Sequence, residues 1–266
     1  MKITTTLFKR SFRPLCLLLI LAISGCSKKN KPSPEPPVVG GGKPQASVNL
    51  LPIKLEQGQL QISLSYIKNT SLLASIVQSN GTTEKFTYTD KDVLKSYERY
   101  RKEELIYLVE YTVDPTGKSI HGAQHFIEAN GKVSSPLGYY DIRLNADNKV
   151  ADVKWYDLND KLQKTLLFNY SESGSINTMV NTSPDVKPVN FIYDDKNGIF
   201  KNTLSCQFLL LENSQTLLYC LKANVIQQSG MTGPNQFSYT YNKDGYPTTV
   251  LSKDENGLLT SWKVSY

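Results

Sequence analysis

The chain has 266 residues, of which 39% are hydrophobic and 10% aromatic, so it is long enough to bury a full hydrophobic core. Its formal net charge is +6, but the first 45 residues carry +7 and leave residues 46–266 at −1. A nucleic-acid-binding protein keeps its basic excess in the folded part, so this distribution argues against nucleic acid as a partner.

The first 25 residues have the parts of a secretory signal peptide: a basic start, an apolar run and small residues before a cleavage point. The apolar run, residues 15–23, is about half the roughly 20 residues that a transmembrane helix needs. Residues 21–26, which end in Cys26, resemble the bacterial lipobox. The resemblance implies that Cys26 receives a diacylglycerol and anchors the chain to a membrane. The alternative is a soluble secreted protein.

Residues 26–45 are predicted to be the lipidated cysteine and a tether rich in proline and glycine, and residues 46–266 the folded domain. In lipoproteins with this motif, aspartate after the cysteine favours the inner membrane, so Ser27 predicts the outer membrane. Lys28 and Lys29 stand where some surface-exposed lipoproteins carry acidic residues. The periplasmic and the cell-surface side therefore both stay open.

A unit of about 22–26 residues recurs through the folded domain. Each unit has an alternating β-type segment that ends in an aromatic or apolar anchor residue, followed by a turn rich in Asp, Asn and Gly. Such residues tolerate the positive φ angles of tight turns, so the pattern predicts stacked antiparallel hairpins. The 48 residues between Tyr193 and Tyr241 predict a degenerate unit within residues 200–236, around residues 208–211. The anchor residues are Tyr66, Tyr88, Tyr111, Leu144, Tyr170, Tyr193, Tyr241 and Tyr266.

The sequence therefore predicts an all-β fold, in which an antiparallel meander of repeated hairpins forms a curved sheet or a partly closed barrel. Helical periodicity is poor, although a turn or two of helix competes with strand or loop in residues 92–105 and 204–212. The strands lack a clear lipid-facing apolar band with aromatic girdles, so the pattern does not predict a membrane channel.

Two segments carry a resemblance to a known family. Residues 193–202, YDDKNGIFKN, and residues 239–248, YTYNKDGYPT, are similar to an uncharacterised family of Bacteroidetes lipoproteins described as having a porin-like fold. The resemblance covers most of residues 50–266 and implies a curved sheet or a barrel with no assigned activity. The tyrosine-then-turn unit also resembles the Tyr-Asp repeats of Rhs-type and teneurin shells.

No catalytic or metal-binding motif is present, so we predict no enzyme activity, no metal and no cofactor. His121 and His125 are four residues apart, and on a strand this spacing separates them by about 13 Å, too far for one metal ion. Calcium binding at residues 194–197 or 152–160 is an alternative, but neither segment has the spacing of an EF-hand loop. Asx-turn formation explains the turn residues Asp90, Asp114, Asp147, Asp194 and Asp244.

Two further features of the sequence bear on function: a pair of cysteines and the high aromatic content. Cys206 and Cys220 either form a disulfide, which the cell envelope permits, or are buried free thiols. The chain also has 16 Tyr, 9 Phe and 2 Trp without catalytic partners, so some of these aromatic side chains are candidates for a binding surface. Since adjacent residues of a strand face opposite sides, the pairs Trp155-Tyr156 and Tyr139-Tyr140, with Trp262, are the candidates for an exposed binding surface.

The leading hypothesis is a membrane-anchored envelope lipoprotein that binds a glycan, a peptide or an envelope protein without catalysis. The first alternative is a structural or scaffold protein of the outer membrane. The second is a hydrolase whose carboxylates, far apart in sequence, meet only in the fold.

Overall fold

The computed structural model describes residues 49–128, 133–182, 186–204, 221–230, 235–254 and 256–266. Cys26 and the tether lie outside these residues, as do Cys206 and Cys220, so lipid attachment and the disulfide stay predictions. Within the described ranges, no helix is long and apolar enough to cross a bilayer.

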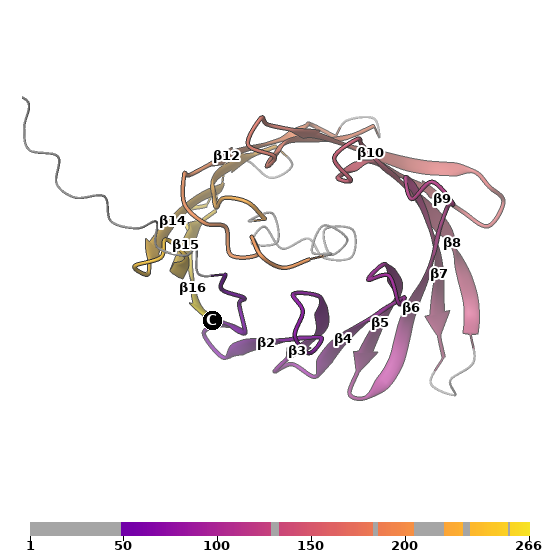
Figure 1. Ribbon diagram of the computed structural model, residues 1–266, viewed down its shortest axis with the longest axis horizontal. Coiled ribbons are helices and arrows are strands. Elements are labelled where there is room, and N and C mark those ends of the chain that lie inside the picture. Colours follow the sequence, from indigo (N-terminus) through magenta and orange to yellow (C-terminus); the bar gives the residue numbers. More distant parts are fainter. Residues whose placement is uncertain (1–48, 129–132, 183–185, 205–220, 231–234, 255) are drawn as a thin grey trace, which may run out of the picture. The chain divides into compact units, whose positions relative to one another are not determined.

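The described residues form sixteen β-strands (Figure 1). In chain order they are β1 (Lys54–Gln57), β2 (Leu60–Tyr66), β3 (Leu73–Gln78), β4 (Thr82–Tyr88), β5 (Leu94–Arg101), β6 (Glu104–Val113), β7 (Ser119–Ile127), β8 (Val133–Leu144), β9 (Val150–Tyr156), β10 (Leu162–Tyr170), β11 (Ile176–Asn181), β12 (Val189–Tyr193), β13 (Val225–Ser229), β14 (Asn235–Tyr241), β15 (Pro247–Lys253) and β16 (Leu259–Ser265).

Every strand pairs antiparallel with its neighbours in sequence, and β1 pairs with β16, so the sheet closes into a barrel. The closing pairs include Lys54 with Ser265 and Leu55 with Val264. The predicted all-β meander is confirmed. Closure removes both edge strands, which an open sheet would leave free to pair with other chains.

The predicted anchor residues lie at or near the ends of the even-numbered strands, from Tyr66 on β2 to Tyr266 directly after β16. Most of the turns that follow are alike. In the turn after β14, the Asn242 N–H donates to Tyr246 O at 2.9 Å and the Gly245 N–H to Asn242 O at 3.1 Å. The Asn242 side chain accepts from two further N–H groups, and Gly245 has a φ of +77°. This local chemistry explains why the repeat is visible in the sequence.

The predicted degenerate unit adds no hairpin to the barrel, and its centre, residues 208–211, lies outside the described residues. β12 pairs directly with β13 through Asn190↔Ser229 and Ile192↔Gln227, so no strands intervene between them. The chain instead makes a long connection, of which residues 194–204 and 221–224 are described and residues 205–220 are not. Residues 94–101 of the ambiguous helical segment form strand β5.

The two faces of the barrel wall differ in chemistry. Strand residues that are paired across the sheet share a face, and on one face they are mostly apolar or aromatic and buried, such as Tyr97, Val109 and Val153. Ile199 and Phe200 of the β12–β13 connection are 0% and 1% exposed and belong to the same core cluster. Figure 1 shows this connection within the ring of strands, so the apolar face is the inner one.

Four of the anchor tyrosines, and Tyr239, donate their hydroxyls to main-chain carbonyls where the strand ladder stops. The β3–β4 ladder ends at Ser75↔Lys85, and beyond it the Tyr88 hydroxyl donates to Leu73 O at 2.8 Å. The same contact recurs in four other hairpins. Its donor and acceptor pairs there are Tyr66 with Pro52, Tyr170 with Val150, Tyr193 with Ile176, and Tyr239 with Val225. In β14 the donor is thus Tyr239 and not the expected anchor Tyr241.

Candidate functional site

The two segments that carry the family resemblance contact each other. The Tyr241 hydroxyl donates to the Asp194 carboxylate. Asn197 reaches the β14–β15 turn twice, because its side-chain amide donates to Asp244 O at 2.8 Å and its N–H to Gly245 O at 3.1 Å. These bonds fasten the β12–β13 connection to the end of β14.

Asn224, which is 0% exposed, completes this fastening. Its side-chain N–H₂ group donates to Asn197 O at 2.9 Å and to the Asp194 carboxylate at 3.1 Å. The carboxylate also accepts from the main-chain N–H groups of Asn224 and Lys196. Asp194 is therefore held by hydrogen-bond donors and joins the β12–β13 connection to β14.

The second calcium candidate, residues 152–160, is engaged in the same way. Asp152 pairs with Arg143, Asp157 accepts from the N–H groups of Asn159 and Lys161, and Asp160 accepts from Tyr139. In the part of the chain that the structure describes, no group of three or more His, Cys, Asp or Glu side chains is placed to hold a metal ion.

Among the predicted Asx-turn aspartates, Asp114 and Asp194 accept main-chain N–H bonds from the residues that follow. Hydrogen bonds from the Thr116 hydroxyl and from the Ser119 N–H hold the pKa of Asp114 below its usual value. In the turns of Asp90, Asp147 and Asp244, the accepting side chain belongs to the first turn residue instead.

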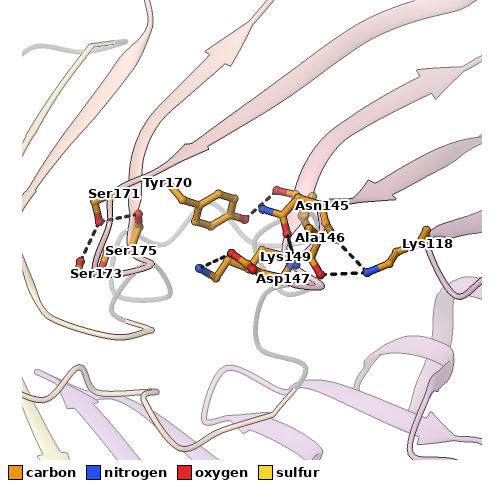
Figure 2. A network of polar contacts seen from close by, with 10 residues as sticks. Lys118, Asn145, Ala146, Asp147, Lys149, Tyr170, Ser171, Ser173 and Ser175 are labelled. Carbon is orange, nitrogen blue, oxygen red and sulfur yellow. Dashed lines mark hydrogen bonds and ion pairs between the residues drawn. The ribbon is translucent and has the colours of Figure 1, made fainter.

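The turn after β6 is hydrogen-bonded to the turn after β8 through Lys118 (Figure 2). The Lys118 ammonium donates to the main-chain oxygens of Asn145 and Ala146, both at 3.2 Å, and to the Asn148 side chain at 2.6 Å. These three acceptors match the three donors of an ammonium group, so Lys118 stabilises the next turn and does not point to a ligand site.

The two histidines lie on the outer face of β7, where each faces a carboxylate. His121 Nδ1 is 2.8 Å from Asp141 Oδ1, and His125 Nε2 is 3.5 Å from Glu110 Oε2. The longer contact lacks hydrogen-bond geometry. The two histidines thus have different carboxylate neighbours.

Only part of the aromatic prediction agrees with the structure. Tyr139 and Tyr156 stack on the outer face with ring centroids 4.8 Å apart and both are half-buried. Desolvation, followed by the hydrogen bond to Asp160, raises the pKa of Tyr139 to about 12. Tyr140 is 0% exposed, and Trp155 and Trp262 pack against the inner core. Each adjacent pair therefore has one ring on the outer face, as alternation predicts, whereas Trp262 pairs in register with the buried Val250 and lies on the inner face.

A cavity of about 590 Å³, the seam cavity, lies where β13 and β14 adjoin. The described residues of these strands pair only at Gln227↔Gln236 and Gln228↔Asn235, after which the Tyr239 hydroxyl bridges to Val225 O. The lining therefore includes both faces of β14. The lining residues are Ile226, Gln227, Gln236, Phe237, Ser238, Tyr239, Tyr241, Leu251, Lys253 and Leu259.

The outer wall around this cavity differs from the rest of the barrel. On β1–β9 the outer positions carry charged side chains, namely Lys54, Glu56, Lys85, Glu98, Glu110, Asp141, Arg143, Asp152 and Lys154. On β10–β16 outer positions carry exposed aliphatic side chains, namely Leu162, Leu167, Ile192, Leu251 and Leu259; on β3, Val77 is exposed in the same way. Lys253 and Lys263 are the charged residues on the outer face of these strands among those described, since Lys164 of β10 pairs in register with Trp155 of the inner face.

Sequence reasoning did not identify the residues of this cavity. Tyr239 belongs to an alternating aromatic segment that the pattern assigns to packing, and nothing near Leu251 or Lys253 distinguishes β15 from the other strands. These residues line one cavity because the described β13–β14 ladder stops after two residue pairs.

Comparison with known proteins gives a distant likeness in fold. No protein-family model matches the chain, and no curated protein is detectably similar to it. A porin-like protein from Bacteroides uniformis is similar, with 10% identity and a TM-score of 0.37 over 80% of this chain and 96% of that one. A porin-like protein from Bacteroides vulgatus has 10% identity and a TM-score of 0.35 over 82% of this chain and 99% of that one. At such identity the likeness concerns the fold alone and assigns no family and no activity.

Proposed function

We propose that this protein is a non-enzymatic binding module that takes a small ligand with an apolar body in the cavity between β13 and β14. The observation that carries the proposal is the cavity itself. Its volume falls within the range of small-molecule sites, and its lining is mainly apolar and aromatic with a few polar side chains.

The side chains around the cavity support a binding role. Ile226, Leu251 and Leu259 are 36%, 41% and 60% exposed, so a ligand would remove apolar surface from water. The Tyr239 and Tyr241 hydroxyls are already bonded to Val225 O and to Asp194. These rings therefore offer apolar surface in fixed positions, which lowers the entropy cost of binding.

Two cavities among the described residues do not offer what the hydrolase alternative requires. A carboxylate mechanism requires two carboxyl groups roughly 5–9.5 Å apart in a cleft. The seam cavity has no acidic residue among its described lining residues, and a second cavity, lined by Glu56, Gly58, Ser261 and Lys263, has one.

The binding proposal is tested with the mature chain carrying Cys26→Ser, which removes the proposed site of lipid attachment. A neutral fluorescent probe, N-phenyl-1-naphthylamine, is expected to bind saturably and to brighten in the apolar cavity. Leu251→Asp should abolish this binding, because it places a charge in the lining. Leu167→Asp is the matched control, since Leu167 is a similarly exposed outer leucine on β10. Absent probe binding, or binding that survives Leu251→Asp, would overturn the proposal.

We also propose that the barrel is held in the cell envelope, at the outer membrane, by lipid on Cys26. The support is the signal-like start and the lipobox-like residues 21–26. Mass spectrometry of the membrane-extracted protein should find a chain that begins at an acylated Cys26. An unmodified cysteine or an intact Met1 would refute the anchor without affecting the cavity.

A further inference from the structure

Lys253 gives the seam cavity a single charge. It lies on the outer face of β15, where it pairs in register with Gln236 of β14 and Leu259 of β16. It is the one charged side chain among the described lining residues. None of the described carboxylates forms an ion pair with it, in contrast to the outer-wall lysine Lys54, which pairs with Glu56 at 2.8 Å.

The remaining polar groups of the cavity lie close to Lys253 in register. Gln236 is its direct partner on β14, and Gln227 is paired to Gln236 on β13. Their amides can donate to an anionic group that the ammonium attracts. Leu251, two residues before Lys253 on the same outer face, continues the lining as apolar surface. The cavity thus has a cationic, hydrogen-bonding part next to an aliphatic and aromatic part.

From this arrangement we propose that the ligand is a small anionic amphiphile whose head group pairs with Lys253 and whose apolar body covers Ile226, Leu251 and Leu259. The inference rests on the proposed function of the cavity and names the class of ligand. A cationic ligand would find no carboxylate in the described lining. Because an ammonium group acts as a point charge, the site accepts a carboxylate or a phosphate head alike.

The experiment displaces the neutral probe from the mature Cys26→Ser chain with three ligands of one chain length: decanoate, decanol and decylammonium. Decanoate should bind about tenfold more tightly than decanol, as expected for one partly exposed charge-assisted contact. Decylammonium should bind more weakly than both. The decanoate advantage should fall as salt is added, because the charge pair is solvent-exposed.

Two substitutions separate this inference from the cavity itself. Lys253→Gln should remove the decanoate advantage, measured within the variant as the ratio of decanoate to decanol affinity. Lys263→Gln, an exposed outer-face lysine on β16 that does not line this cavity, should leave both that ratio and probe binding unchanged. Probe binding without a decanoate advantage, or an advantage that survives Lys253→Gln, would overturn the anionic preference while the binding function stands. If the probe does not bind, both proposals fall.

Discussion

Replacing Tyr170 by Phe tests the role of the anchor hydroxyls. The Tyr170 hydroxyl donates to Val150 O at 2.8 Å, and Val150 is 2% exposed, so the substitution leaves a buried carbonyl without this donor. Such a loss costs about 1–3 kcal/mol. The Lys149 ammonium, 5.2 Å from the centre of the Tyr170 ring, keeps an aromatic face in either variant.

The same hydroxyl predicts a pH dependence. Burial raises the pKa of Tyr170 above its ordinary value of about 10. Below pH 10 both the folded and the unfolded state keep the proton. Above it the unfolded state loses the proton first, so the stability that the hydroxyl contributes declines. At pH 11 the loss is at most about 1.4 kcal/mol, the free energy of one proton over one pH unit. The Tyr170→Phe variant has no hydroxyl to titrate, so the difference in stability between wild type and variant should shrink by up to this amount from pH 8.

Urea denaturation at pH 8, 9.5 and 11, with the slope checked for constancy, measures both effects. Tyr100→Phe is the control at pH 8, because its hydroxyl donates to Glu98 on the outer face at 2.5 Å and its loss should cost within about 0.5 kcal/mol. The reasoning fails if Tyr170→Phe is no more destabilising than this control. It also fails if the difference from wild type is the same at every pH.

Two further predictions concern stability and the β12–β13 connection. Gly138→Ala should lower the free energy of unfolding by at least about 2 kcal/mol, because Gly138 has a φ of +110° and a Cβ there would lie 2.1 Å from Tyr156 O. Gly58→Ala, with positive φ but nothing within 4 Å, should cost only about 1 kcal/mol, and equal losses in thermal or urea unfolding would contradict the steric reason. Asn224→Ala should speed hydrogen exchange in residues 194–204, since it removes the bonds to that segment; unchanged exchange would show that other contacts hold it.

The hairpin repeat could be predicted from the sequence because its determinants are local. A turn such as residues 242–246 is closed by bonds between its own residues, so its side chains reveal it. Spacing alone does not distinguish a degenerate hairpin from an inserted connection, which explains the error between Tyr193 and Tyr241. The face of an aromatic residue is also ambiguous: alternation shows that Tyr139 and Tyr140 point to opposite sides, but only the register with Trp155 shows which one is inside.

By itself the sequence determined the strands, the turns and the tyrosines at the strand ends, because hydrogen bonds within a turn and alternation along a strand are properties of short segments. Only the tertiary structure decided that the barrel closes, since Lys54 and Ser265 lie at opposite ends of the domain and no local pattern records their pairing. The cavity likewise depends on where the ladder between β13 and β14 stops. Its lining combines both faces of one strand, and an alternating pattern assigns those faces to opposite environments.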